Sequence, residues 1–533
     1  MMKSHEKIDF GIPTNKEDIT VTADSPVTPP NNVGDPVVRP EGVTASERYL
    51  GRLCENSFLS LWSYPNVFRD QGRKDGKGDG KELCDVLVIF ENHIIVFSDK
   101  DIAFDNSCDI QADWARWYRR AVVKSAKQVY GAERWIRNFP ERLFLDRRCT
   151  VPFPLVLPGP SKAQFHRIVV AHDASRQCRE RLGGSGSLMI DNSVIGDAHL
   201  KQPFRIGHID PTKGYVHVFD DTTLDIVMKT LDTVSDFTAY LTKKELFLTD
   251  KKAVLAAGDE ELLAVYLGRM NDSGEHDFAI KGNYDRLIFP EGFWEEFTRS
   301  PERQAQINYD EISYAWDKLI ETFAFHAMTG TQYLPTGTPL CEQEKAFRFL
   351  AREPRTRRRL LANSLHEVLE RSIHSRSPWD ARVILPSRIG DPFYVFLFLK
   401  RRPGMSDEEY RMARFQLLSD YCHVTKLEHP DAVAVIGIAT EAGLESRRSE
   451  DLCYLDASHW NNNAQQRAHE AQQKLGLLTK VTLHMTREHE YPVNHNGQPV
   501  STVLSRNSPC SCGSGERFKR CCGKDLFRKR TSR

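Results

Sequence analysis

The sequence lacks both a long hydrophobic run and an excess of charge of one sign. In its 533 residues the most apolar stretch, Phe393 to Leu399, ends at Lys400, whereas a membrane-spanning helix needs about 20 apolar residues. The first residues also lack the apolar segment of a secretory signal. The 73 Lys and Arg residues balance 73 Asp and Glu residues, so the net charge neither favours nor excludes nucleic acid. We therefore expect a cytoplasmic protein without a membrane segment.

Disulfide bonds are not expected either, although the sequence has 12 cysteines. Eight lie singly along the chain, several within apolar segments, as is typical of reduced core thiols. These are Cys54, Cys84, Cys108, Cys149, Cys178, Cys341, Cys422 and Cys453. The other four lie close together near the C-terminus and are Cys510, Cys512, Cys521 and Cys522. Four thiolates at this spacing can complete a tetrahedral zinc shell, so we predict a zinc site there.

Changes in residue pattern divide the chain into five parts. Residues 1–42 are rich in Pro, Thr, Asn and Asp, which predicts a disordered leader. Residues 43–290 mix helical and strand patterns and predict an α/β domain. Residues 291–375 are expected to be helical, and residues 376–497 to form a second α/β unit of unknown role. Residues 498–533 contain a linker, the cysteine cluster and a basic tail.

The second α/β unit has a simple pattern. Strand-like segments at 393–399 and 432–438 flank a helical segment at 406–421. Ser406 and Glu409 have the spacing of a capping box at the start of that helix. The pattern predicts two parallel strands joined by a right-handed crossover. The sequence offers no recognisable site there.

A predicted β-hairpin brings charged residues together in the first α/β domain. Its strands, 83–90 and 93–100, are separated by two residues. Asp85 lies in the first strand, and the second ends in Asp99 and Lys100. Phosphodiester hydrolysis needs a divalent cation, held by carboxylates, that activates water and neutralises charge on the phosphate. Because a neighbouring lysine can orient or deprotonate that water, the hairpin is a candidate nuclease site.

The order and spacing of these residues resemble the PD-(D/E)xK restriction-endonuclease superfamily over residues 44–174. The resemblance implies a restriction-endonuclease-like fold and hydrolysis of DNA with Mg²⁺. It implies that Asp85 and Asp99 bind Mg²⁺ and that Lys100 orients or activates the water. Glu47, at the start of the preceding helix, would assist in catalysis.

The next helix, over about 113–137, is basic and amphipathic. Lys124 and Gln128 share one of its faces, and the resemblance implies that they contact nucleic acid. A solvated helix face explains these two residues equally well. The arginine run from Arg357 to Arg359 is expected to be solvated helix surface.

One residue departs from the pattern of the superfamily. Ser98 lies thirteen residues after Asp85, where the superfamily has its second acid. Because side chains alternate along a strand, Ser98 and Lys100 share a face and Asp99 points away. Three alternatives follow: a β-bulge brings Asp99 to the site, the acid has moved to another position such as Glu82, or the site is inactive.

The cysteine cluster resembles the SEC-C motif, C-x-C-x8-C-(H/C). The pattern is met in full by Cys510, Cys512, Cys521 and Cys522. The resemblance implies one bound zinc ion and docking to proteins, ribosomes or nucleic acid. The tail around it is rich in Arg and Lys, which fits an acidic partner, although a solvated tail explains it as well.

These motifs lead to two alternative functions. The first is a Mg²⁺-dependent nuclease that cleaves DNA and, by analogy, serves prokaryotic restriction or anti-phage defence. The second is a non-catalytic adaptor in which the nuclease fold is degenerate and the zinc module docks a ribosome, a chaperone or nucleic acid. Asp85 and Lys100 favour the nuclease, and Ser98 favours the adaptor.

Overall fold

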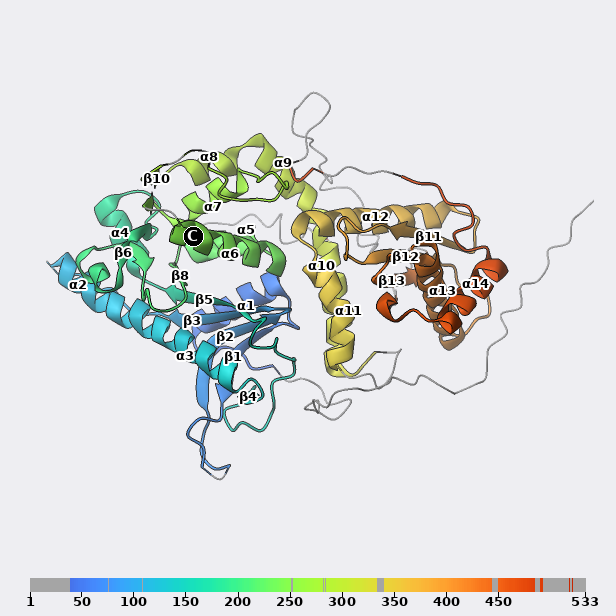
Figure 1. The fold of residues 1–533 in the computed structure, drawn as a ribbon, viewed down its shortest axis with the longest axis horizontal. Helices are drawn as coiled ribbons and strands as arrows, with labels where there is room; N and C mark the ends of the chain where they lie inside the picture. The colour runs from blue at the N-terminus through green and yellow to red at the C-terminus, as the bar shows by residue number, and fades with distance from the viewer. Residues whose placement is uncertain are drawn as a thin grey trace, which may run out of the picture.

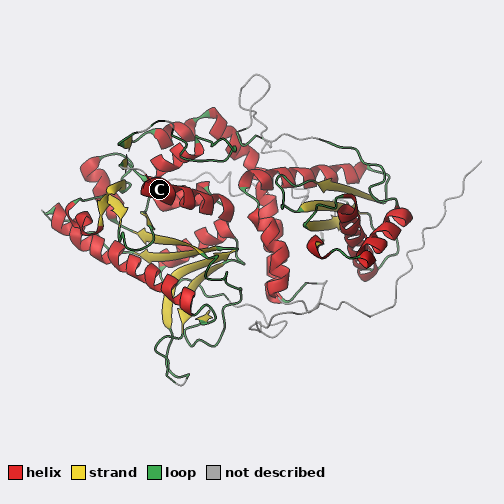
Figure 2. Cartoon of the chain, in the orientation of Figure 1, coloured by secondary structure: helices red, strands yellow, loops and turns green. Residues whose placement is uncertain are grey.

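The computed structural model describes residues 39–74, 76–107, 109–250, 253–280, 282, 284–332, 340–442, 449–484, 489–491, 517 and 520. Most of the predicted leader lies outside these residues, as do Cys510, Cys512, Cys521 and Cys522. The described chain is a mixed α/β protein with three β-sheets (Figures 1 and 2). None of its described helices is long and apolar enough to cross a membrane.

The largest sheet lies in the N-terminal half and has the strand order β4-β1-β2-β3-β5-β8. Its strands are β1 (Ser63–Arg69), β2 (Lys81–Phe90), β3 (His93–Lys100), β4 (Leu143–Phe144), β5 (Gln164–Ala171) and β8 (Val216–Phe219). The hairpin of β2 and β3 is confirmed. β5 is parallel to β3, and β8 is parallel to β5. The carboxyl ends of these three strands therefore lie at one edge.

Helices cover both faces of this sheet (Figure 1). One face carries α2 (Ile110–Tyr118) and α3 (Lys124–Asn138), which are joined without a break by a π-helical turn, Arg119–Val123. The other face carries α1 (Ala45–Phe58), α5 (Thr223–Thr230) and α6 (Val234–Asp250). α1 begins with a capping box built by Thr44 and Glu47.

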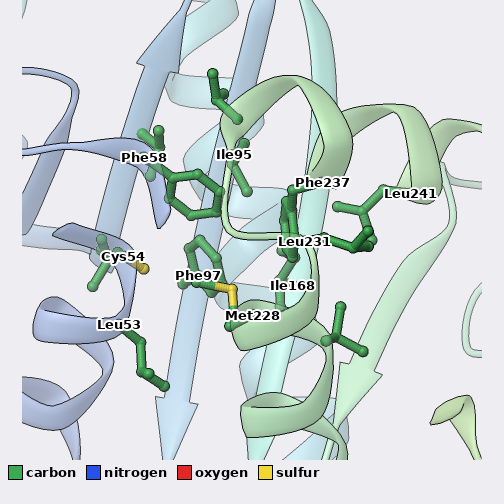
Figure 3. Packing of buried hydrophobic residues seen from close by; sticks show 14 of the residues in the cluster. Leu53, Cys54, Phe58, Ile95, Phe97, Ile168, Met228, Leu231, Phe237 and Leu241 are labelled. Atoms are coloured by element: carbon green, nitrogen blue, oxygen red, sulfur yellow. The ribbon is translucent and has the colours of Figure 1, made fainter. Parts of the chain in front are cut away.

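Apolar packing identifies which strand residues face which helices. Phe58 of α1 lies over Phe97 of β3, with ring centroids 6.3 Å apart, and over Phe237 of α6 at 5.0 Å. Figure 3 shows this packing between the sheet and the helices α1, α5 and α6. Because side chains alternate along β3, Ser98 and Lys100 point to the opposite face, under α3.

A second sheet, ordered β10-β9-β6-β7, lies beside the first. Its strands are β6 (Met189–Ile195), β7 (Arg205–His208), β9 (Val254–Ala256) and β10 (Leu287–Phe289). Two helices, α4 (Ala174–Leu182) and α7 (Asp259–Leu267), precede β6 and β10 in the chain.

Five helices and a third sheet come next in the chain. The helices are α8 (Phe293–Arg299), α9 (Pro301–Asp310), α10 (Tyr314–Thr329), α11 (Leu340–Arg352) and α12 (Arg355–His374). The third sheet contains β11 (Trp379–Ile384), β12 (Phe393–Leu399), β13 (Ala434–Glu441) and β14 (Glu450–Asp456). α13 (Asp407–Glu428) joins the parallel strands β12 and β13, and α14 (Asn462–Leu475) follows β14. The capping box of Ser406 and Glu409 is confirmed.

The arginine run of α12 differs from the expectation. Arg358 and Arg359 are buried, at 1% and 0% exposure. Arg358 binds Asp317 of α10 at 2.7 Å, and Arg359 binds Asp310 of α9 at 2.9 Å. The prediction of solvated surface is therefore wrong for these two residues, because α12 is covered by α9 and α10 on the side that they occupy.

Candidate functional site

Asp85 and Lys100 lie together under α3. The β2–β3 register places Asp85 on the same face as Ser98 and Lys100. Its Oδ2 accepts a hydrogen bond from the backbone N–H of Asp99 at 2.5 Å and lies 3.5 Å from Lys100 Nζ. The side chain of Asp85 is 1% exposed, whereas that of Lys100 is 26% exposed. A buried carboxylate thus lies beside an amine that solvent can reach.

The negative charge of Asp85 is only partly compensated. Its Oδ1 is buried and accepts no hydrogen bond from the described residues. Burial raises the pKa of Asp85 to about 6. Lys100 and the Asp99 N–H lower the pKa, while the charges of Glu82 and Glu47 raise it further. Cations are stabilised where carboxylates crowd together in this way.

A β-bulge brings Glu82 to the side of Asp85. In the pairing of β1 with β2, Val67 pairs with Cys84 and Phe68 with Glu82, so β2 holds one extra residue, Leu83. In a regular strand Glu82 and Asp85, three residues apart, would face opposite sides. The extra residue interrupts this alternation, and the charge of Glu82 lies close enough to Asp85 to raise its pKa. The bulge lies in β2, whereas β3 pairs with β5 without a register shift.

Asn66 of β1 links the two glutamates. Its Nδ2 donates to Glu82 Oε1 at 2.7 Å and lies 3.4 Å from Glu47 Oε2. Asn66 is buried and has a φ of 46°, which is a left-handed conformation inside a strand. Such conformations cost free energy and cluster at functional sites. The same Glu47 oxygen accepts the backbone N–H of Val43 at 2.8 Å, so Glu47 also stabilises the start of α1.

The side chain of Asp99 points away from Asp85, to the other face of the sheet. Its Oδ1 lies 2.7 Å from His172 Nε2. His172 directly follows β5, and its Nδ1 lies 2.6 Å from Oδ1 of Asp221, which follows β8. The three side chains therefore form a chain across the carboxyl ends of β3, β5 and β8. Asp99 reaches Asp85 only through its backbone N–H.

His172 is held in its charged form. Burial lowers its pKa, but the hydrogen bonds and charges of Asp221 and Asp99 outweigh this effect and raise the pKa to about 10. Burial raises the pKa of Asp221, and the contacts with His172 lower it below its usual value. A cation between two carboxylates fixes the end of β3. His172 thereby positions the Asp99 N–H and, through it, Asp85.

α3 contributes one polar contact to the Asp85 face. Ser98 Oγ donates a hydrogen bond to Gln128 Oε1 at 3.0 Å. Lys124, one turn earlier, is exposed to solvent. Gln128 therefore reaches the strand residue next to Lys100, while Lys124 faces outward at the same end of α3.

The outer face of α2 and α3 is uniformly basic. Within Ile110–Asn138, which the structure describes in full, every exposed charged side chain is basic. We call this set the basic ridge, and its members are Arg116, Arg119, Arg120, Lys124, Lys127, Arg134 and Arg137. A ridge of this charge favours polyanions.

The residues around Asp85 are compatible with a divalent cation. Among the described residues, no group of three or more His, Cys, Asp and Glu side chains is placed to hold a metal ion. Mg²⁺, however, commonly takes only one or two carboxylates and completes its shell with water and substrate phosphate. The orphaned Oδ1 of Asp85 and the neighbouring Glu82 carboxylate fit that requirement.

His172, Asp221 and Asn66 are not found by the motif reasoning. A sequence signal exists for the first two, because His172 directly follows a segment that predicts a strand and Asp221 lies two residues after another such segment. In α/β sheets the carboxyl ends of parallel strands are the usual place for ligands. Asp220, beside Asp221, caps the start of α5 as its position suggests, and accepts the backbone N–H of Thr223 at 2.9 Å.

Comparison with known proteins identifies only the C-terminal segment. Residues 506–524 match the SEC-C motif. UPF0225 protein GSU1048 of Geobacter sulfurreducens is 62% identical over 24 residues, which are 4% of this chain and 15% of that protein. The chain thus spans only a small part of the length of that relative. No solved structure matches the chain. The protein therefore carries a SEC-C motif at residues 506–524.

Proposed function

We propose that the N-terminal half is a metal-dependent nuclease that hydrolyses phosphodiester bonds of DNA. The observation that carries the proposal is the buried, partly compensated Asp85 carboxylate, which has Lys100 beside it and the charge of Glu82 nearby. The order of leading helix, hairpin and basic helix supports it. A role in prokaryotic restriction or anti-phage defence is part of the proposal by analogy.

The residues of the site have distinct roles in this proposal. Asp85 and Glu82 hold Mg²⁺, which when bound lowers the pKa of water and neutralises charge on the phosphate. Lys100 Nζ, partly exposed beside Asp85, orients the attacking water. The Asp99 N–H fixes the Asp85 carboxylate, and His172 fixes Asp99. Asp99 then acts as a positioning residue, and of the three alternatives for the second acid we adopt Glu82.

Substitutions of Glu82 and Asp99 test which of the two is the second metal ligand. Cleavage of linear and supercoiled DNA is measured with Mg²⁺ or Mn²⁺, with EDTA as the metal-free reference. Glu82→Gln and Asp85→Asn remove metal ligands, so each should lower the cleavage rate by about a hundredfold or more. Asp99→Asn keeps the backbone N–H and should retain more activity than either.

A matched control is available in the third sheet. Asp380 is a strand carboxylate 3.5 Å from Arg371, the same separation as Asp85 from Lys100, and also has a buried, unpartnered oxygen. Asp380→Asn should cleave at the wild-type rate. An equal loss of cleavage rate in Asp380→Asn and Glu82→Gln would contradict the proposed site. Full cleavage activity in Asp85→Asn would contradict it as well.

The second candidate is a non-catalytic adaptor, favoured by Ser98 at the usual acid position and by the engagement of Asp99 with His172. In that case the nuclease-like half is a binding surface and the SEC-C motif docks a ribosome, a chaperone or nucleic acid. The adaptor shows no cleavage with any metal. Its cellular activity also survives Lys100→Ala at wild-type expression, which the nuclease does not allow.

The SEC-C motif carries a proposal of its own. We infer that Cys510, Cys512, Cys521 and Cys522 hold one zinc ion, because four thiolates in so short a segment match a closed structural site. A segment of this length has no core, so zinc supplies most of its folding free energy. Elemental analysis of protein purified without chelator should give one zinc per chain.

A further inference from the structure

A basic pocket lies along α3 from Lys127 to Asn138. Its volume is about 530 Å³, and its lining includes Lys127, Arg134 and Arg137 of α3, Arg167 of β5, and Lys213. Arg137 lies over the ring of Phe165 at 4.4 Å. Phe165 is at the start of β5, whereas Lys100 pairs with Ala171 at its end. The Arg137 end of the pocket and the Asp85 site therefore lie towards opposite ends of the β-strands.

The lining carries far more positive than negative charge. Glu133 is its one acidic member, and it binds Arg167 at 2.5 Å and Arg137 at 2.9 Å. Lys213 pairs with Asp210, outside the pocket, at 2.7 Å. Lys127 and Arg134 have no acidic partner among the described residues. The pocket thus keeps unpaired cations at its mouth and is suited to an anion.

Arg167 forms a rigid floor for the pocket. It is buried, at 8% exposure, and its Nη1 lies 3.4 Å from the Tyr215 carbonyl oxygen. A Cβ at Gly214 would overlap the Arg167 guanidinium, so the guanidinium occupies space that only glycine leaves open. Tyr130 donates a hydrogen bond to the Gly214 carbonyl at 3.0 Å and holds α3 to this turn. The floor of the pocket is therefore built from buried, hydrogen-bonded groups.

The basic ridge connects this pocket to the end of α3 beside Lys100. Arg137 lies thirteen residues after Lys124, which corresponds to about 20 Å of helix at about 1.5 Å per residue. One strand of B-DNA advances about 3.4 Å per nucleotide along the helix axis. The ridge therefore matches the length of about six base pairs.

We propose that the pocket binds a backbone phosphate of a nucleic acid that lies along the ridge, within about six base pairs of the Asp85 site. The proposal rests on the proposed function and extends it, because it states in which direction the bound DNA runs from the Asp85 site. The recognised group is a phosphate diester, which offers acceptor oxygens to guanidinium and ammonium groups. These contacts read charge and spacing and not base sequence.

The test measures binding and not cleavage. The full chain is titrated onto a fluorescently labelled DNA duplex in EDTA, and fluorescence anisotropy is followed from about 50 to 200 mM salt. The variant Lys127→Gln with Arg134→Gln removes the two cations that hold this phosphate, so the slope of log affinity against log salt should fall by about one. The control, Arg467→Gln with Lys474→Gln, removes two exposed cations of α14 and should keep the wild-type slope.

Further measurements show whether the pocket binds DNA or only free phosphate. They also distinguish this proposal from the proposed nuclease activity. Inorganic phosphate at equal ionic strength should compete with DNA in the wild type and less in the double variant. Equal slopes for the double variant and the wild type would overturn the inference, as would phosphate binding without DNA binding. Because binding is read in EDTA, a failure of Mg²⁺-dependent cleavage refutes the proposed function and leaves this result in place.

Discussion

Replacing Asp85 by asparagine should stabilise the fold. In the structure the pKa of Asp85 rises from 3.8 to about 6 because the carboxyl is buried, and Lys100 and the Asp99 N–H only partly offset this rise. Moving the pKa of one carboxyl that far corresponds to about 3 kcal/mol of unfolding free energy. Asparagine has the same shape without the charge and retains an oxygen for the Asp99 N–H. Asp85→Asn should therefore gain up to about 3 kcal/mol at pH 8.

The gain depends on pH with a definite sign. A carboxyl with a raised pKa contributes stability when it is protonated, so its contribution is complete below pH 3.8 and is lost as pH rises through about 6. Asparagine stays neutral at every pH. The melting temperatures of wild type and Asp85→Asn should therefore converge near pH 4 and separate between pH 4 and 7.

Thermal unfolding of the full chain in EDTA, followed from pH 4 to 8, measures this difference. One kcal/mol shifts the melting temperature of a domain of roughly 150–250 residues by about 2–4 °C, so the transition of the N-terminal half should rise by several degrees at pH 8. Asp317→Asn is the control of opposite sign. Asp317 binds Arg355 at 2.8 Å and Arg358 at 2.7 Å, and breaking a buried pair costs about 3–5 kcal/mol.

Two results would contradict the predicted stabilisation by Asp85→Asn. One is a melting temperature of Asp85→Asn that lies below the wild-type value at pH 8, since Asp85 would then be a stabilising structural carboxylate. The other is a difference that does not change between pH 4 and 8, since the gain would then not come from ionisation. Either result would remove the electrostatic argument for a cation at this site.

Three further predictions concern neighbouring features. His172→Gln should flatten the alkaline loss of stability, because a His pKa raised from 6.5 to about 10 contributes stability that is complete below pH 6.5 and is lost towards pH 10; melting curves from pH 7 to 10 test this. Lys100→Ala should lower cleavage by about a hundredfold while anisotropy shows DNA binding retained. Cys521→Ser with Cys522→Ser should release the zinc, read by elemental analysis, and leave the main thermal transition unchanged, whereas a large shift of that transition would show that the motif is part of the core.

The hairpin and the pairing of Asp85 with Lys100 could be predicted because they depend on local sequence. Two strand-like segments with two residues between them can form only a tight hairpin, and alternation along the strands then decides which side chains meet. The same alternation places Asp99 on the other face, where it binds His172, whereas its expected role as a Mg²⁺ ligand would need a bulge that β3 does not show. Local patterns were therefore sufficient for this part of the site.

The remaining features depend on contacts distant in sequence. β1 contains Pro65 and a left-handed Asn66, so it has no regular strand pattern, and the bulge at Leu83 arises only when β1 pairs with β2. Without that pairing, Glu82 would be expected to face away from Asp85. Arg358 and Arg359 are buried for a similar reason, because their partners lie on other helices, α10 and α9.

The most direct test of the central claim is the binding of Mn²⁺, as a stand-in for Mg²⁺, to the full chain, followed by electron paramagnetic resonance with a DNA duplex present. We expect one site in the wild type that is lost in Asp85→Asn and in Glu82→Gln and kept in Asp99→Asn and Asp380→Asn. Wild-type Mn²⁺ binding in Asp85→Asn and Glu82→Gln would contradict the claim that these two carboxylates form a metal site.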